Sequence, residues 1–511
     1  MKEMTQYPRF VVFFLLGIIV TSGAFLRFWN LGEPSLWIDE GYTINASQAI
    51  LEHNYPLLDS GQWYKGWLTT TYLTAGSMSI LGFDPFSPWP ARLPSVVFGI
   101  ALILAVFFFA YILFRNSAIA LAAAFLTGFS QWIIAWSQQA RGYTLLALLV
   151  VFILYFAWKF FETKEKRFLF YGIITSVFAY LTSTLSLLVL PVIASWWLID
   201  IATKKQLLRK TDWKSLTFSM IGVFIGALIF FELPIRFTRM TPADILYPTY
   251  FQFLFTDLRW LTSGALLATI LGFFDKKRFR PVMFAFLSLA LPAQFIVQYS
   301  PVVQLRYLFP FFPLMIILFS YTIYRAVEII SFGIRKHHLR SKQVLTNIRN
   351  YQLVLIIAFA LTVAISFPCL QFTPKHPELE WGSPQPDFKA VFQEIEKSRS
   401  QADVIISPYA HFHQIYLGEK GFWLLMSLTG RQAAIEKQLK LGRDYYTAAP
   451  IVKDIDHFIE LLNTQTGFVI IDDMARIRLR QEVAILLQHP KVEMIFESKK
   501  PKLGSIWLYK F

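Results

Sequence analysis

Two adjacent carboxylates, Asp39 and Glu40, are the residues of this sequence whose types and position best suit chemistry. They follow the first long apolar segment, at the start of a polar loop that is rich in Trp and Tyr. A carboxylate is the usual general base when an acceptor hydroxyl loses its proton as it attacks. The pair therefore predicts acid–base chemistry beside a membrane. The alternative interpretation is structural, with Asp39 as the N-cap of a helix that starts near Gly41.

Arginine and lysine side chains expected on the same side of the membrane as this pair could bind an anion. The planar fork of Arg donates two parallel hydrogen bonds to a phosphate, whereas Lys acts as a point charge. Arg141-Gly142-Tyr143 and Arg306-Tyr307 both fall at ends of apolar segments, where the alternative is an interfacial belt that anchors helices to headgroups. The charged residues that we expect on this side of the membrane, besides the acidic pair, are Lys65, Arg92, Arg141, Glu232, Arg236 and Arg306.

The composition indicates a membrane protein. Of 511 residues, 55% are hydrophobic, 17% aromatic and 16% charged, whereas about a quarter of the residues in soluble domains are charged. The net charge of +15 would suggest a nucleic-acid partner in a soluble protein, but in a membrane protein such a surplus collects in cytoplasmic loops. We therefore expect no nucleic acid. The single cysteine, Cys369, excludes an intrachain disulfide and a cysteine-based metal cluster.

Apolar runs long enough to cross a bilayer can be counted along the chain. A helix needs about 20 apolar residues to span the hydrocarbon core. We predict about eleven such helices, so the expected fold is a polytopic α-helical membrane protein. The runs are 10–26, 93–114, 118–136, 143–161, 168–183, 185–201, 216–233, 258–274, 281–297, 308–330 and 351–370.

The distribution of basic residues predicts the orientation of these helices. Clusters such as 159–167, 204–214 and 276–280 all fall on the side of the N-terminus, which the positive-inside rule makes cytoplasmic. An odd number of spans then places the C-terminus outside. The first outer loop is residues 28–90, and its segments 40–52 and 66–81 have the mixed polarity of helices that lie on a membrane surface.

The composition changes after the last apolar run. We divide the chain into a transmembrane catalytic domain, 1–370, a proline-rich linker, 371–386, and a small α/β domain, 387–511, outside the membrane. In the last domain, short apolar runs predict strands and amphipathic stretches predict helices. The expected strands are 404–406, 468–471, 492–496 and 505–509, the last two joined as a hairpin, and the expected helices are 388–398, 455–462 and 476–487.

Two further groups in this domain could bind a ligand. His411-Phe412-His413 would place two imidazoles on one face of a strand, a conceivable metal pair, but a solvated face is the simpler interpretation. Asp472-Asp473 follows a predicted buried strand, where α/β domains often keep binding residues. With no partner motif beside it, we expect a turn at the end of the strand.

Four motifs together resemble the GT-C membrane glycosyltransferases, in the branch of the protein O-mannosyltransferases and the aminoarabinose lipid A transferases. The resemblance covers roughly residues 10–330 and is weak over the last domain. The four motifs occur in the order and topology of that family, which is more specific than any one of them. They are Leu36-Trp37-Ile38-Asp39-Glu40, Ala91-Arg92-Leu93-Pro94-Ser95, Gln139-Ala140-Arg141-Gly142-Tyr143 and Arg306-Tyr307-Leu308-Phe309-Pro310.

The resemblance implies transfer of a sugar from a polyprenyl-phosphate donor at the extracytoplasmic face. Asp39 would be the catalytic base and Glu40 its catalytic neighbour. A basic residue that meets the lipid phosphate falls at Lys65, but Tyr64 stands where some relatives carry a ligating acid, so we expect no metal and no cofactor. The segment 181–184 also lacks a histidine that is frequent in the family. The residues expected to bind the donor phosphate are Lys65, Arg141, Tyr143, Arg306 and Tyr307.

The remaining partners follow from the same expectation. The acceptor would be a lipid, glycan or protein that offers a hydroxyl or a phosphate, and the protein would be a multi-pass protein of a bacterial plasma membrane. The competing class is a transporter or flippase for a lipid or sugar, which would use the same charged cavity without a base. Inverted repeats and broken midplane helices would favour that class, and the sequence shows neither. A polysaccharide polymerase or ligase shares the donor type but not the acidic first loop.

Overall fold

The computed structural model describes residues 9–204, 243–275, 277–299, 304–338, 386–424, 442–500 and 504–511. The chain divides into two compact units. We call them the helical unit, which comprises Met1–Arg27, Val97–Ser137 and Tyr143–Pro374, and the α/β unit, which comprises Phe28–Val96, Gln138–Gly142 and Lys375–Phe511. Each unit is described by itself.

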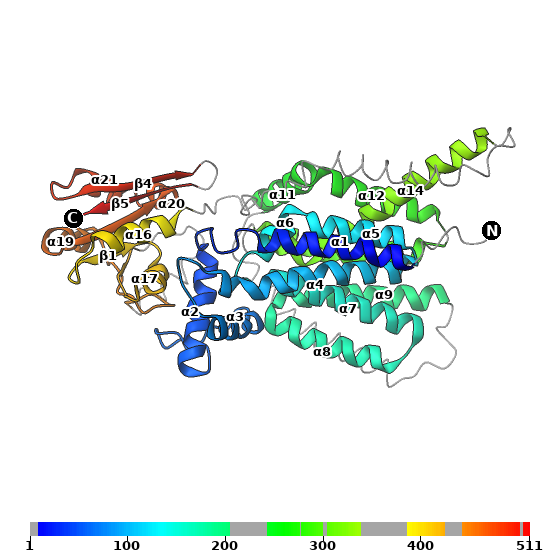
Figure 1. The fold of residues 1–511 in the computed structure, drawn as a ribbon, viewed down its shortest axis with the longest axis horizontal. Helices are drawn as coiled ribbons and strands as arrows, with labels where there is room; N and C mark the ends of the chain where they lie inside the picture. The colour runs from blue at the N-terminus through cyan, green and yellow to red at the C-terminus, as the bar shows by residue number, and fades with distance from the viewer. Residues whose placement is uncertain are drawn as a thin grey trace. The chain divides into compact units, whose positions relative to one another are not determined.

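The helical unit consists of long apolar helices, as predicted. Two of the eleven predicted runs, 216–233 and 351–370, lie outside the described residues, as do Glu232 and Arg236. Within the unit, α7 packs against α8 and α9, and α12 packs against α14 (Figure 1). Its elements are α1 Arg9–Phe28, α4 Trp89–Phe114 (which begins in the α/β unit), α5 Ser117–Phe129, α6 Gln131–Ser137, α7 Tyr143–Thr163, α8 Lys166–Thr182, η1 Thr184–Leu188, α9 Val189–Lys204, α11 Ala243–Gln252, η2 Phe253–Asp257, α12 Arg259–Phe274, α13 Phe279–Tyr299, η3 Leu305–Phe311 and α14 Phe312–His338.

Five helices among the described residues are long and apolar enough to cross a membrane. A sixth span results if α5 and α6 are counted together, since they are separated by a bend of 57°. The predicted run 118–136 is therefore a broken helix. The runs 185–201 and 258–274 form shorter apolar helices, and the run 168–183 is α8. The structure thus supports a multi-pass membrane protein.

A buried arginine holds the break between α5 and α6. The last turn of a helix leaves its carbonyl groups without intrahelical partners. Arg27 of α1 is completely buried, and its guanidinium donates to the carbonyls of Thr127 at 3.1 Å and Gly128 at 2.9 Å, in the last turn of α5. Its Nε also donates to the Ser137 hydroxyl at 3.2 Å. Arg27 is therefore a structural residue.

The α/β unit combines two helices of the first loop with a sheet from the end of the chain. The sheet has the order β2-β1-β3-β5-β4; β1 is parallel to β2 and β3, and β5 is antiparallel to β3 and β4. The expected hairpin is β4–β5, and β2 was not foreseen. The elements are α2 Ile38–His53, α3 Leu68–Leu81, α16 Phe388–Ser398, β1 Val404–Ser407, α17 Ala410–Leu417, β2 Phe422–Trp423, α19 Ile455–Thr464, β3 Gly467–Asp472, α20 Asp473–Arg478, α21 Arg480–Gln488, β4 Glu493–Lys500 and β5 Gly504–Lys510.

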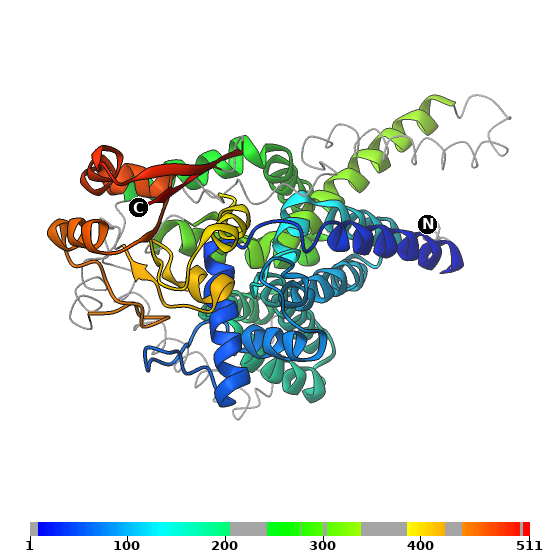
Figure 2. The ribbon, with the colours of Figure 1, turned by 60° about the vertical axis from the view of Figure 1, so that its left-hand side comes forward.

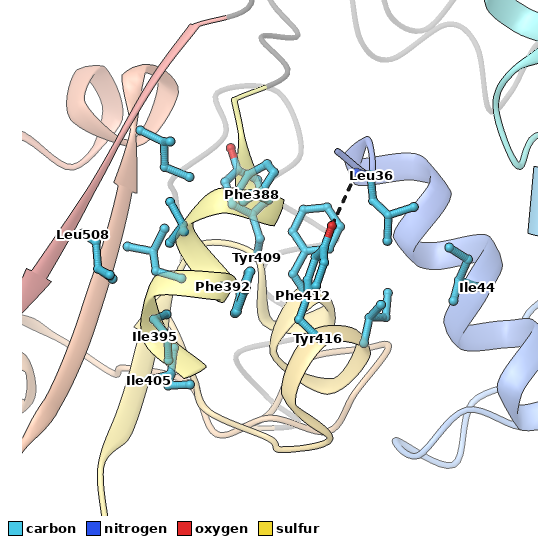
Figure 3. Packing of buried hydrophobic residues seen from close by; sticks show 14 of the residues in the cluster. Leu36, Ile44, Phe388, Phe392, Ile395, Ile405, Tyr409, Phe412, Tyr416 and Leu508 are labelled. Atoms are coloured by element: carbon cyan, nitrogen blue, oxygen red, sulfur yellow. Dashed lines mark hydrogen bonds between the residues drawn. The ribbon is translucent and has the colours of Figure 1, made fainter. Parts of the chain in front are cut away.

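One apolar core joins the first loop to the C-terminal region. Leu36 and Ile44, from the loop, pack in the same buried cluster as Phe392, Phe412 and other apolar residues of the sheet and its helices (Figure 3). The contacts therefore group residues 28–96 with the C-terminal region. In the predicted division the loop belongs to the transmembrane domain. The difference arises because the apolar faces of α16 and α17 are buried by packing against apolar side chains of the loop. Most of the expected linker lies outside the described residues.

Candidate active site

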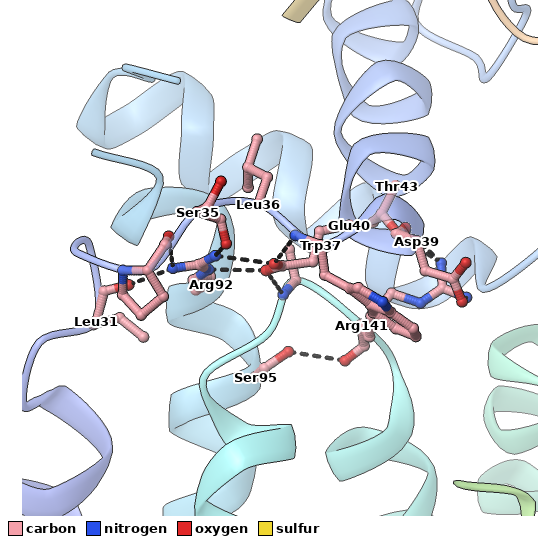
Figure 4. Close-up of polar contacts among 12 residues, drawn as sticks. Leu31, Ser35, Leu36, Trp37, Asp39, Glu40, Thr43, Arg92, Ser95 and Arg141 are labelled. Atoms are coloured by element: carbon pink, nitrogen blue, oxygen red, sulfur yellow. Dashed lines mark hydrogen bonds and ion pairs between the residues drawn. The ribbon is translucent and has the colours of Figure 1, made fainter. Parts of the chain in front are cut away.

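The carboxylate of Glu40 forms a buried ion pair with Arg92, a residue of α4 (Figure 4). Both side chains are 0% exposed, and the guanidinium donates to the two carboxylate oxygens at 2.8 and 2.9 Å. The backbone N–H groups of Trp37 and Ala140 donate to the same carboxylate at 3.0 and 2.8 Å. Burial acts to raise the pKa of Glu40, but Arg92 and these hydrogen bonds outweigh it and hold the pKa below its usual value. Glu40 is therefore an ionised structural group.

The remaining donors of Arg92 fix the loop that leads to the acidic pair. Its guanidinium donates to the backbone carbonyls of Leu31 at 2.8 Å, Pro34 at 3.0 Å and Ser35 at 3.1 Å. An Arg side chain carries five N–H donors, and here all five are used. Arg92 thus binds the entry of the loop and the start of α2 at once.

The first turn of α2 is capped by Glu40, so the alternative interpretation of Asp39 as the N-cap is wrong. The helix begins at Ile38 with Trp37 as its N-cap, and the Glu40 side chain reaches back from the third helical position to the Trp37 backbone. This is the acidic half of a capping box. Asp39 is therefore not the cap of this helix.

Asp39 points to the opposite side from Glu40, towards Arg141 (Figure 4). Its side chain is 21% exposed, and a carboxylate oxygen lies 3.5 Å from the guanidinium of Arg141. That guanidinium also donates to the Asp39 carbonyl at 3.0 Å and to the Thr43 hydroxyl at 2.9 Å, and it lies 5.2 Å from the Trp67 ring. The structure therefore brings together one partly accessible carboxylate and one cation, and an oriented cation beside a reachable base suits transfer from an anionic donor.

The other predicted donor-binding residues are divided between the two units. Lys65 is an exposed residue of the α/β unit and follows the buried Tyr64. In the helical unit, Tyr143 begins α7 and its ring lies 6.4 Å from that of Phe309 in η3. The same short helix carries Arg306, which is 8% exposed, and Tyr307. Tyr143 and the Arg306 segment are thus neighbours. The phosphate-binding role of these residues stays a prediction.

The interpretation of His411 and His413 as a solvated strand face is wrong. Both lie on α17, a helix of eight residues, and both are buried, at 2% and 0% exposed. Burial lowers the pKa of each imidazole to about 3, so both are neutral near pH 7. Gly418 follows in the left-handed conformation, the usual C-cap of a helix. Reading that glycine as a cap would have indicated a helix instead of a strand.

Asp472 does not end its strand in a simple turn. It is the N-cap of α20, since its side chain accepts from the backbone N–H of Ala475 at 2.8 Å, and the Tyr409 hydroxyl donates to it at 2.7 Å. Burial raises its pKa.

Among the described residues, no group of three or more His, Cys, Asp or Glu side chains could hold a metal ion.

Comparison with known proteins identifies the fold. No protein-family profile and no curated protein sequence matches the chain. The structure of ArnT from Cupriavidus metallidurans bound to undecaprenyl phosphate matches 96% of this chain and 97% of its own, with a TM-score of 0.57 at 12% identity. The archaeal oligosaccharyltransferase AglB from Archaeoglobus fulgidus, in complex with an inhibitory peptide and a dolichol-phosphate, matches 98% of this chain and 74% of its own, with a TM-score of 0.56 at 12% identity.

The chain has the GT-C fold. The sequence resemblance is thereby confirmed for the fold. At 12% identity the likeness shows the fold and does not extend to individual residues.

The ion pair predicts a large effect of Glu40→Gln on stability. Removing one charge of a buried pair leaves the other uncompensated, which costs about 3–5 kcal/mol of unfolding free energy. Thermal unfolding of the purified protein should show a clear fall in Tm. Glu52→Gln, on the exposed end of the same helix, is the matched control and should change the stability by about 0.5 kcal/mol or less.

The pH dependence of this effect has a definite sign. Because folding lowers the pKa of Glu40, its contribution is complete above the ordinary carboxyl pKa of about 4.3 and is lost as the pH falls through the lowered value. The difference in Tm between the wild type and Glu40→Gln should therefore shrink in acid. Equal Tm values at pH 7 would contradict a structural role for the pair.

Proposed function

We propose that the protein is a glycosyltransferase that moves a sugar from a polyprenyl-phosphate donor to an acceptor hydroxyl or phosphate, with Asp39 as the general base and inversion at the anomeric carbon. The observation that carries the proposal is the Asp39–Arg141 pair, a partly exposed carboxylate at 3.5 Å from a cation. Two proteins of the same fold support the donor class, since ArnT binds undecaprenyl phosphate and AglB binds a dolichol-phosphate.

The chemistry requires few groups. The acceptor oxygen forms a bond to the anomeric carbon while the bond from that carbon to the phosphate oxygen breaks, and the acceptor proton passes to the Asp39 carboxylate. The polyprenyl phosphate leaves as an anion, so it needs cations and not a general acid. Arg141 is anchored beside Asp39 by Thr43 and by the Asp39 carbonyl, which places one cation within reach of the base. Lys65 and Arg306 are the other cations proposed to bind the donor phosphate. Tyr143 and Tyr307 are further residues proposed to bind it.

Glu40 supports this reaction without taking part in it. Both of its oxygens are bonded, and it is fully buried against Arg92. Successive residues of a helix are rotated by about 100°, so a first turn fixed by Glu40 presents Asp39 on another face. The acidic pair thus divides into a fixed carboxylate and a reactive one.

Replacement of the base should lower turnover strongly and leave donor binding intact. Asp39→Asn keeps the size and hydrogen bonding of the side chain and removes its basicity, and the loss of a positioned base costs about 10²–10⁴ in rate. The measurement incubates the purified protein with radiolabelled polyprenyl phosphates of mannose, glucose, galactose and aminoarabinose, with lipid extract as acceptor, and follows consumption of each. Undecaprenyl phosphate binding is measured in parallel.

The controls distinguish loss of the catalytic base from loss of the folded structure. Glu52→Gln should keep the wild-type rate, and Asp39→Asn should unfold at the wild-type temperature. A wild-type rate for Asp39→Asn would dismiss the base assignment. If the wild-type protein consumed none of the donors with lipid, glycan or protein acceptors, the transferase proposal would fail.

We also propose a metal-free mechanism. Glu40 has both oxygens engaged by Arg92 and backbone donors, and Tyr64 stands where some relatives carry a ligating acid. Donor consumption should therefore be unchanged after treatment with EDTA. Activity that is lost to the chelator and restored by a divalent ion would overturn this proposal.

The proposed orientation places residues 28–90 and 387–511 outside the membrane and the N-terminus in the cytoplasm. In a Cys369→Ser background, cysteines at the exposed positions Glu52 and Ser400 should react with an impermeant thiol reagent in intact cells. A cysteine at Lys166, the exposed first residue of α8 at the end expected to be cytoplasmic, should react only after permeabilisation. The reverse pattern would contradict the orientation.

A further inference from the structure

The two helices of the first loop, α2 and α3, lie side by side (Figure 2). The residue before α3, Trp67, has φ 55° and ψ 35°, in the left-handed region. A bulky residue rarely adopts this conformation, because its Cβ atom comes too close to the following carbonyl oxygen, and such strain persists only where the surroundings hold it. Here the backbone N–H and the hydroxyl of Thr71 donate to the Trp67 carbonyl at 2.9 and 3.0 Å. These bonds fix the turn from which the Trp67 side chain projects.

The Trp67 ring lies against the backbone that carries Arg141. A Cβ atom added at Gly142 would lie 2.3 Å from Cε3 and 2.9 Å from Cζ3 of this ring. Real Cβ atoms do not approach other atoms so closely, so a glycine at position 142 is what allows the ring to lie there. The indole ring is therefore packed on the main chain immediately after Arg141.

The same ring also contacts the side chain of Arg141. The guanidinium carbon lies over the Trp67 ring, 5.2 Å from its centroid. A guanidinium is attracted to the face of an indole ring at such a distance. From the side of α2, the Asp39 carbonyl and the Thr43 hydroxyl accept hydrogen bonds from the guanidinium. Arg141 is thus held by α2 through hydrogen bonds and by the segment before α3 through an aromatic ring.

The two kinds of contact restrain different parts of the Arg141 side chain. Both hydrogen bonds to α2 come from the same nitrogen, Nη1, so they anchor the guanidinium at one point. The contact with the rigid Trp67 ring restrains the group at a second point. The orientation of the guanidinium matters for an anionic ligand, because a phosphate accepts two parallel hydrogen bonds from it.

We propose that Trp67 is a positioning residue for Arg141, the cation proposed to meet the donor phosphate. The inference rests on the proposed function and deepens it, because it explains what holds this cation in place 3.5 Å from the Asp39 carboxylate. Without the ring, the guanidinium keeps its hydrogen bonds to α2 but can turn about them. Donor binding and stabilisation of the departing phosphate then weaken together.

Trp63 supplies a matched control. It lies in the same loop, is 52% exposed and stacks on Tyr55, with the ring centroids 5.3 Å apart. Trp63→Leu therefore removes an indole ring from the same loop, at a position where the ring packs on Tyr55.

The test compares substitutions of Trp67 that keep or remove the aromatic face. Trp67→Phe keeps a ring, whereas Trp67→Leu keeps apolar volume without one. Neither new residue is β-branched, so neither adds strain at this φ beyond that of Trp. The other variants are Trp63→Leu, Arg141→Gln and the double variant Trp67→Leu with Arg141→Gln. For each we would measure Tm and, well below the lowest Tm, the Kd for undecaprenyl phosphate and the kcat with the donor that the wild type consumes.

Trp67→Leu should raise the Kd for undecaprenyl phosphate about 5- to 30-fold and lower kcat, whereas Trp67→Phe should stay within about 3-fold of the wild type. Trp63→Leu should match the wild type. In the Arg141→Gln background, Trp67→Leu should change the Kd no further, because the side chain that the ring positions has been removed.

A wild-type Kd and kcat in a folded Trp67→Leu variant would overturn the inference. So would equal losses in Trp67→Phe and Trp67→Leu, or the same loss with and without Arg141, since either result would indicate a structural effect of the loop. If Trp67→Leu does not fold, Trp67→Met takes its place, and the comparison with Trp67→Phe decides without Arg141→Gln. The Kd requires no turnover. If Asp39→Asn is inactive while Trp67→Leu is fully active, the positioning role fails and the proposed function stands.

Discussion

The buried pair of Glu40 and Arg92 is the interaction on which the α/β unit depends. A carboxylate and a guanidinium that are both inaccessible to solvent are costly to bury, and they are tolerated only when every donor and acceptor is satisfied. Here the five donors of Arg92 and four donated hydrogen bonds to Glu40 meet that condition. The pair ties α4, the loop before α2 and the backbone at Ala140 to a single point, and the position of Asp39 follows from it.

The arrangement separates two neighbouring carboxylates by burial. Glu40 is sealed, whereas Asp39 keeps about a fifth of its side chain in contact with solvent and meets Arg141. Since adjacent helical residues diverge, one rigid turn can hold a structural acid and, in the proposed mechanism, present the base. The packing of α17 at Gly41 adds a restraint from the far end of the sequence. A terminal region that could be taken for an appendage therefore shares its core with the site.

Much of this could be predicted from the sequence, because the signals were local. Apolar length predicted the helices, and the order of four motifs predicted the fold. The contacts between residues far apart in the sequence could not be predicted. Nothing local to Glu40 shows that Arg92, 52 residues away, buries it, and Glu40 rather than Asp39 proved to be the capping residue. The alternation of His411 and His413 with Phe412 suggested a strand, but the ring contacts with α2 and β1 that bury these side chains are not encoded in spacing.

In the proposed reaction, the acceptor attacks the anomeric carbon directly while Asp39 takes its proton. The most direct measurement is the anomeric configuration of the first product, determined by NMR after reaction of a donor of known configuration with the purified protein. A single displacement predicts inversion at that carbon. Retention of configuration would require a covalent intermediate or attack from the same face, and it would contradict the role given to Asp39.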